Sequence, residues 1–559
     1  MSGDGQVFGL GGWAAWRFFS SSARLPDMSR RLGRAWGTLG LGLLLSGCSA
    51  CSSSKNGSGP DLGPSGRLYF VAVDGDDEAP GTRDRPFRTL TRAMNAPDAA
   101  QLFVNAGVYR EPRLVVDRSI EFIGPGGHQA VLEGRLEVSA RSVSWSGIDV
   151  SAGMSVKASE GFVMKDARVS PASERETFLL ENSSGNISGL EVICGVDSCL
   201  SVQGSTVAFA RIDLGPEATK TSARVLRVSS SSVSIDGLHA RSGVVTQVQA
   251  ERGSDLTIRG GTLGAGAGNQ LVASLGSKIS GFDLEIPEPG QLGALAARGE
   301  LRLVRSRVGS SSNICVGTQG GLLILQETDL GACAFGSVSA ANFNDTTATV
   351  QMRGGVVRHG RFAGVNLSQG RVVIEGTRFE GVPDYADEGD DAILASSPAA
   401  EIIVRGATIE DATGNGVGIY NGARGEVRAV VRNPRLSGIM VGRSPGGEVR
   451  IRGSEISGCR GGSGIVVFDS TGVSVETTVA SACQEAGLIA GDRSEVSIDN
   501  GTFENNLHYG VAAFGGSTVT MTRSTAKGSP WATFASCGDG SRIEDAGDNR
   551  FEGPTTDCF

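Results

Sequence analysis

The sequence has 559 residues, of which 39% are hydrophobic and 20% charged, so it has enough apolar side chains for a large core and is neither a disordered chain nor a membrane bundle. Its 83 glycines outnumber Phe, Trp and Tyr together, which favours a fold that turns every few residues. From residue 48 onward, 46 Lys and Arg stand against 58 Asp and Glu, a net charge of −12. We therefore expect no nucleic acid partner, because binding to phosphates needs clustered positive charge.

The first recognisable segment begins at Met28, and residues 1–27 before it are interpreted as an over-extended gene start. Three arginines between residues 30 and 34 precede an apolar stretch over residues 36–45. This stretch is about half of the ~20 residues that a helix needs to cross a bilayer. Residues 28–47 are therefore predicted to be a signal peptide and not a spanning helix.

The apolar stretch ends in Leu45-Ser46-Gly47-Cys48, which resembles the lipobox of bacterial lipoproteins. The resemblance implies that cleavage makes Cys48 the new N-terminus and that its thiol is acylated, so that the chain reaches the membrane through this lipid anchor. Residue 49 is Ser and not the Asp of an inner-membrane retention signal, so we expect an outer-membrane location, with either the periplasmic face or the cell surface open. The alternative is an ordinary secretory signal with a chance cysteine. Residues 48–66 are rich in Ser, Gly and Pro and are interpreted as a flexible tether.

The folded body is predicted to begin with a cap over residues 67–110, which contains a row of short motifs. They are Tyr69-Phe70-Val71, Asp74-Gly75-Asp76-Asp77, Pro80-Gly81-Thr82, Arg85-Pro86-Phe87 and Val104-x-Ala106-Gly107-x-Tyr109. Together they resemble the opening segment, of the DUF1565 type, of bacterial β-helix proteins of the pectin-lyase-like superfamily. Leu90, Ala93 and Met94 form an apolar stripe at helical spacing, which predicts a short helix lying over the open first coil.

The C-terminal third contains a repeat of about 23 residues. Gly-plus-apolar strings begin at residues 416, 438, 464, 487 and 510, and a second series of alternating apolar residues begins at Val449, Val473, Val496 and Val519. A third inward position is predicted at Phe379, Ile409, Ile456 and Phe503. This period is too short for a propeller blade and lacks the amphipathic helix of many solenoids. We therefore predict an all-β fold, a three-sided parallel β-helix of about nineteen coils over residues 111–559, right-handed as the resemblance implies.

Eight cysteines of the body fall into sequential neighbours, and no Cys-x-x-Cys pair suggests zinc. They are Cys194/Cys199, Cys315/Cys333, Cys459/Cys483 and Cys537/Cys558. An even number in an exported chain indicates disulfides, although eight cysteines allow 105 pairings. Cys459 and Cys483 lie 24 residues apart, one coil, and each follows an apolar residue expected to face inward, Ile456 and Val479. We predict that these two cysteines stack and bond, and that Asn506, one coil later, continues the column as a polar ladder.

Five acidic side chains within eight residues form the best local candidate for a site. They are Asp384, Asp387, Glu388, Asp390 and Asp391. Carboxylates this close repel one another unless they are solvated or neutralised, so calcium is a possible ligand. Residues 389–393 are similar to the paired-Asp string of polygalacturonase-like hydrolases, which implies Asp390 and Asp391 as candidate catalytic residues. Against this, residues 414–416 read Gly-Asn-Gly where those enzymes carry Gly-His-Gly, and no Arg-Ile-Lys string follows. The alternative is a solvated loop that lengthens its coil.

His508, beside Asn505, Asn506 and Tyr509, is a weaker candidate for a catalytic base, against the simpler interpretation of an exposed turn. Two hypotheses of function follow. The first is a non-catalytic, lipid-anchored envelope β-helix that binds or displays a glycan or a protein. The second is a calcium-assisted polysaccharide lyase or hydrolase of the pectin-lyase-like superfamily. An enzyme needs the acidic loop, a base and a groove on one face within a few coils, whereas a display protein does not.

Overall fold

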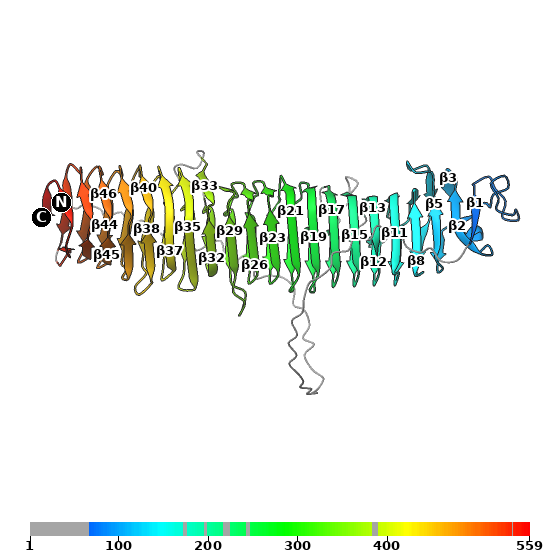
Figure 1. Ribbon diagram of the computed structural model, residues 1–559, viewed down its shortest axis with the longest axis horizontal. Helices are drawn as coiled ribbons and strands as arrows, with labels where there is room; N and C mark the ends of the chain where they lie inside the picture. The colour runs from blue at the N-terminus through cyan, green and yellow to red at the C-terminus, as the bar shows by residue number, and fades with distance from the viewer. Residues whose placement is uncertain are drawn as a thin grey trace, which may run out of the picture. The chain divides into compact units, whose positions relative to one another are not determined.

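The computed structural model describes residues 66–558, apart from residues 172–175, 195–197, 216–223, 242–245, 361, 383–389 and 539. Parallel strands follow one another along the long axis of Figure 1, and each pairs with the strand one coil later. The predicted all-β fold of about 19 turns is confirmed. The predicted signal peptide, Cys48 and the tether up to residue 65 lie outside the described residues.

The strands of the described residues form two parallel sheets, a first sheet of 33 strands and a second sheet of 20. The second sheet contributes one strand to each coil. Its strands are β4 (Arg113–Val116), β7 (Arg135–Val138), β10 (Met154–Lys157), β12 (Glu176–Glu181), β14 (Ser198–Gln203), β16 (Arg224–Ser229), β18 (Thr246–Glu251), β20 (Asn269–Ser274), β22 (Leu292–Ala297), β25 (Ile314–Gln319), β28 (Val338–Ala341), β31 (Val365–Leu367), β34 (Ile393–Ser396), β36 (Val417–Tyr420), β38 (Ile439–Gly442), β41 (Ile465–Phe468), β44 (Ala486–Gly491), β47 (Tyr509–Phe514), β50 (Ala532–Cys537) and β53 (Thr555–Cys558).

The first sheet forms the remaining sides of each coil and begins with β1 (Arg67–Val71) and β2 (Ala99–Val104). Towards the C-terminus most coils add two of its strands. They include β30 (Val356–His359), β33 (Arg378–Gly381), β35 (Ala400–Glu410), β37 (Arg424–Arg432), β39 (Val449–Arg452), β40 (Glu455–Ser457), β42 (Val473–Glu476), β43 (Val479–Ser481), β45 (Glu495–Asp499), β46 (Thr502–Glu504), β48 (Thr518–Thr522) and β49 (Thr525–Lys527). Of these, β35 and β37 are single long strands that each pair with two strands of a neighbouring coil. Side chains alternate between core and surface along each strand, so one row of apolar residues per strand fills the interior. The predicted inward positions Phe379, Ile409, Ile456 and Phe503 are all buried.

The first coil is covered by the helix α1 (Leu90–Met94), which packs Leu90, Ala93 and Met94 against β1, β2 and β4. Its N-terminus is fixed by two polar side chains. Thr89 accepts a hydrogen bond from Arg92 N at 3.1 Å, and the buried Glu111 carboxylate accepts from Leu90 N at 2.6 Å. These acceptors satisfy amide groups that have no partner within the helix.

Serine hydroxyls form a ladder at the turn where the chain leaves the second sheet. In each step the backbone N–H of one serine donates to the side-chain Oγ of the serine one coil later, at 3.0–3.4 Å. The ladder runs through Ser159, Ser183, Ser205, Ser231, Ser254 and Ser277, and a second run joins Ser444, Ser470, Ser494 and Ser517. The hydroxyls satisfy buried turn amides that no strand could pair.

Disulfides bond Cys194 to Cys199, Cys315 to Cys333, and Cys459 to Cys483. Cys537 is also disulfide-bonded. Its register partner on β53 is Cys558, whose side chain lies outside the described set.

The column of Cys459 and Cys483 continues into Asn506 as predicted. Asn506 accepts from Cys483 N at 3.0 Å and donates to Ala480 O at 3.2 Å. The inward assignment of Val479 was wrong, because Ala480 is the register partner of Ile456 and fills the core. Val479 instead pairs with the exposed Glu455, so the inward row of this strand is one residue later than the apolar pattern indicated.

Candidate functional site on the outer face of the second sheet

The Asp391 carboxylate lies on the outer face of the second sheet, just before β34. It occupies the space above Gly418 in the next coil, where any side chain would collide with the Asp391 carboxylate and the Tyr420 ring. Gly418 faces outward because its neighbours Val417 and Ile419 face the core. A single glycine therefore makes room for the site.

Three donors surround this carboxylate. Asn415 donates to Oδ1 from its backbone N at 3.1 Å and from Nδ2 at 2.7 Å, and the Tyr420 hydroxyl donates to Oδ2 at 2.9 Å. Burial, reinforced by the neighbouring charge of Asp390, raises the pKa of Asp391 to about 6 even though the donors oppose the shift. The pKa of the Tyr420 hydroxyl is also raised, first by burial and then by the charge of Asp391.

Asp390 lies beside this centre, and its Oδ1 accepts the Asp391 backbone N–H at 2.9 Å. Burial raises the pKa of Asp390 too. A carboxyl group with a pKa near 6 can give or take a proton at neutral pH. Asp391 is only 4% exposed, however, and its hydrogen bonds join two neighbouring coils, so they stabilise the fold.

The same hydrogen bonds begin a second ladder along the turn that enters the second sheet. Ser437 N donates to Asn415 Oδ1 at 2.9 Å, and Ser463 N donates to Ser437 Oγ at 3.2 Å. Asp391 thus stands in a column of side chains that each accept a turn amide from the following coil. This column supplies the buried carboxylate with hydrogen-bond donors from the following coil.

The other members of the predicted calcium site, Asp384, Asp387 and Glu388, lie outside the described residues. In the part of the chain that the structure describes, no three His, Cys, Asp or Glu side chains are grouped so that they could hold a metal ion. Calcium therefore stays a prediction about the loop before Asp390.

A buried histidine that the sequence analysis did not single out lies one coil before this loop. His359 on β30 faces the core, and its Nδ1 is 3.5 Å from Thr413 Oγ1, while its Nε2 has no hydrogen-bond partner among the described residues. Burial lowers the pKa of His359 to about 4, so the ring is neutral. In the sequence, His359 could have been noticed because it takes an inward position of its strand, where an apolar side chain is expected.

His508 lies directly before β47 of the second sheet, outside the Asp391 cluster, in a group of aromatic side chains. Its ring stacks on Trp531, with centroids 4.2 Å apart and planes 25° apart, and Tyr509 meets the Trp531 ring at 6.3 Å and 89°. Trp531 is 63% exposed and Leu507 is 52% exposed. We call Leu507, His508, Tyr509 and Trp531 the aromatic ledge. Trp531 was not predicted as a site residue, although it follows His508 by 23 residues, one coil.

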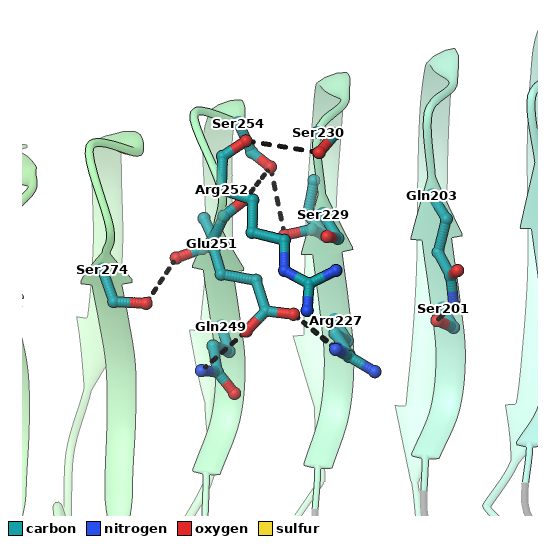
Figure 2. Close-up of polar contacts among 12 residues, drawn as sticks. Ser201, Gln203, Arg227, Ser229, Ser230, Gln249, Glu251, Arg252, Ser254 and Ser274 are labelled. Atoms are coloured by element: carbon teal, nitrogen blue, oxygen red, sulfur yellow. Dashed lines mark hydrogen bonds and ion pairs between the residues drawn. The ribbon is translucent and has the colours of Figure 1, made fainter. Parts of the chain in front are cut away.

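A second polar group lies further towards the N-terminus on the outer face of the same sheet (Figure 2). Arg227 on β16 binds the Glu251 carboxylate on β18 through Nε at 2.8 Å and through a terminal guanidinium nitrogen at 2.5 Å. Gln249 Nε2 lies 3.5 Å from the other carboxylate oxygen. Arg227 and Glu251 pair between neighbouring coils, so each charge is neutralised by the other, whereas Gln249 and Glu251 lie on the same strand.

The stacked coils define the class of protein as a parallel β-helix. The family described as "Right handed beta helix region" matches residues 391–553, and the family described as "Protein of unknown function (DUF1565)" matches residues 73–113. Together with the stacked parallel coils, these two matches support a right-handed β-helix of the pectin-lyase-like type.

Solved structures of carbohydrate enzymes are among the chains similar to this one. The periplasmic alginate epimerase AlgG is 8% identical with a TM-score of 0.24, over 76% of this chain and 78% of its own. The GH136 lacto-N-biosidase from Eubacterium ramulus is 11% identical with a TM-score of 0.23, over 57% and 64%. A GH87 alpha-1,3-glucanase catalytic domain is 12% identical with a TM-score of 0.19, over 88% and 70%. At these values the likeness carries no argument about the site.

No curated protein matches this chain. The five-residue helix α1 is far too short to span a bilayer. Among the described residues, no other helix is long and apolar enough to span one.

Proposed function

We propose that this protein is an exported, lipid-anchored β-helix of the cell envelope that binds or displays a glycan or an envelope protein without changing it chemically. The single observation that carries the proposal is the aromatic ledge. An indole and a leucine side chain that are both more than half exposed, on neighbouring coils, cost solvation free energy unless a partner covers them. The proposed anchor is Cys48 and the proposed location is the outer membrane, both on the strength of the lipobox resemblance.

The Asp391 cluster supports a binding role over a catalytic one. Its three donors hold the carboxylate in a turn ladder, and His508, the other candidate base, is stacked in the ledge. An acid and a base that act together must both reach the bond that breaks in one substrate, and these two groups belong to different parts of the sheet.

The test uses the full chain purified in detergent and a panel of neutral and acidic polysaccharides, with and without calcium. Retained binding, unsaturated uronate absorbance and reducing ends are measured together. We expect binding without product, and we expect Trp531→Ala to weaken it. Capture on immobilised envelope proteins, again compared with Trp531→Ala, covers the protein alternative.

A calcium-assisted polysaccharide lyase or hydrolase is the second candidate, favoured by the raised pKa of Asp391 beside Asp390. Product that forms with calcium and disappears in both Asp390→Ala and Asp391→Ala would establish it and overturn the binding proposal. Product that persists in both variants would point to a contaminating enzyme.

A further inference from the structure

We infer that the aromatic ledge is a subsite for a neutral sugar ring within a glycan. The inference rests on the proposed function and deepens it, because it names the class of ligand that the same site takes.

The ring geometry leaves one face of the indole for a ligand. His508 and Tyr509, the two rings in contact with Trp531, both belong to the preceding coil. They support the indole from that side, at 4.2 Å in a stack and at 6.3 Å edge-on. Trp531 is 63% exposed, so most of the indole surface that His508 and Tyr509 leave uncovered is accessible to a ligand. A flat, supported aromatic face suits the C–H side of a pyranose ring, which is apolar and nearly flat.

A hydrogen-bond acceptor belongs to the coil before His508, two coil spacings or roughly 10 Å from Trp531. It therefore serves a neighbouring sugar unit of a glycan that crosses the coils and not the ring stacked on Trp531. The backbone N–H groups of His508 and Tyr509 both donate to Glu485 O at 2.9 Å, which places Glu485 in the coil directly before the ledge. Ser463 Oγ donates to Glu485 Oε2 at 3.4 Å, and in the described residues this carboxylate has no ion pair. A carboxylate accepts hydrogen bonds from sugar hydroxyl groups more strongly than a neutral acceptor does.

The charge of the surroundings selects against acidic glycans. The ledge contains no Lys or Arg, its neighbour Glu485 is an acid, and the chain from residue 48 onward carries a net charge of −12. A uronate or sulfate group would meet the like charge of Glu485, and none of the four ledge residues is a Lys or Arg that could pair with it. A neutral sugar is not repelled by this negative charge, and its binding free energy includes the contact with the Trp531 ring.

The experiment titrates the full chain in detergent with cellohexaose, maltohexaose, N-acetylchitohexaose and hexagalacturonate, following tryptophan fluorescence and heat. We expect at least one neutral hexasaccharide to bind and to perturb the fluorescence, and hexagalacturonate to bind more weakly. Trp531→Ala should raise the Kd of the neutral hexasaccharide about tenfold or more. Trp531→Tyr should keep most of the affinity because tyrosine also has an aromatic face.

Two controls keep the result specific. Phe343→Ala removes another exposed aromatic side chain, 40% exposed and paired with Arg298 at 5.1 Å, and should leave the Kd unchanged. Circular dichroism before and after heating should show that Trp531→Ala folds as the parent does, because a side chain that is mostly exposed contributes little to the core.

Three results would overturn the inference. They are binding that Trp531→Ala leaves unchanged, a preference for hexagalacturonate, and no binding of any neutral hexasaccharide. If Trp531→Ala instead weakens binding of an acidic polysaccharide or of an envelope protein, this inference fails while the proposed function stands. If neither glycans nor envelope proteins bind, both fail.

Discussion

At the scale of single residues, two buried titratable groups near the acidic loop have pKa values displaced in opposite directions. Burial raises the pKa of Asp391 to about 6 and lowers that of His359 to about 4. Thr413 lies between them, with its hydroxyl 3.5 Å from His359 Nδ1 and 3.4 Å from Asp390 O. Both groups prefer their neutral form in the fold, so the pH dependence of stability contains two opposing contributions.

Asp391 makes the protein less stable as the pH rises. The folded state holds this proton more tightly than the unfolded chain, whose Asp has a pKa near 3.8. Its contribution is therefore complete below about pH 4 and is lost as the pH rises through about 6, a change of about 3 kcal/mol at most. Asp391→Asn keeps the acceptor for Asn415 and removes the titration.

We expect the free energy of unfolding of Asp391→Asn, relative to the parent, to increase between pH 4.5 and pH 7.5 in urea titrations. The exposed Asp236→Asn serves as the control and should show a constant difference. A constant difference for Asp391→Asn as well would contradict the raised pKa.

His359 acts in the opposite sense. Its folded-state pKa lies below the ordinary value of 6.5, so the fold excludes a proton that the unfolded chain accepts. The contribution is present above about pH 6.5 and is lost as the pH falls towards 4, again by about 3 kcal/mol at most. His359→Leu removes both the titration and the unpaired Nε2.

His359→Leu should gain stability over the parent as the pH is lowered from 7.5 to 4.5, measured by urea unfolding at each pH. The matched control is His239→Gln on an exposed position, which should follow the parent. Equal pH profiles for His359→Leu and the parent would show that the imidazole is accessible to protons in the fold.

At the scale of elements, the turns depend on side-chain ladders as much as the strands depend on apolar rows. Ser231 shows the arrangement, because its Oγ accepts from Ser205 N at 3.1 Å and donates to Ser229 O at 2.7 Å. A buried amide that loses its acceptor keeps the full cost of desolvation. The ladders therefore set which small polar residues each turn tolerates.

Ser231→Ala should lower the free energy of unfolding by about 1–3 kcal/mol, because Ser205 N is left without an acceptor in a dry turn. The neighbouring Ser232→Ala changes an exposed hydroxyl and should have an effect within about 0.5 kcal/mol. Chemical denaturation of both variants makes the comparison. Equal effects would show that water replaces the Oγ acceptor of Ser231.

At the scale of the whole molecule, the described coils contact mainly the coils next to them, so stability is close to a sum of neighbour terms. The disulfide between Cys459 and Cys483 ties two such coils across 24 residues. Closing a loop of this length contributes about 3–4 kcal/mol in the chain-entropy description. Loss of this disulfide should therefore destabilise the two coils that it joins and their neighbours, and not the entire stack.

We expect the double variant Cys459→Ser/Cys483→Ser to lose amide hydrogen-exchange protection in β40, β43 and the adjoining coils. Protection in β12, β14 and β16, many coils away, should match that of the parent. Uniform loss of protection along the chain would instead indicate that the stack unfolds as one cooperative unit.

The sequence by itself determined the repeat and therefore the fold. A period near 23 residues with alternating apolar residues can bury a core only by stacking coils, so the inward positions Phe379, Ile409 and Phe503 and the column from Cys459 to Asn506 could all be predicted. Motifs of this kind are local or recur at a fixed interval, and both properties are visible in a linear chain. The shift at Val479 shows the limit, since one residue of register exchanges the inner and outer faces.

Only the tertiary structure decided what surrounds the candidate residues. The space over Gly418 that admits Asp391, and the donors Asn415 and Tyr420 that surround it, depend on the register between coils and on outward side-chain directions. The stack of His508 on Trp531 likewise joins residues one coil apart that no motif links. Burial and hydrogen bonding between coils set pKa values and exposure, and they arise only when the coils are stacked, which is why the sequence named Asp391 and His508 but not their environments.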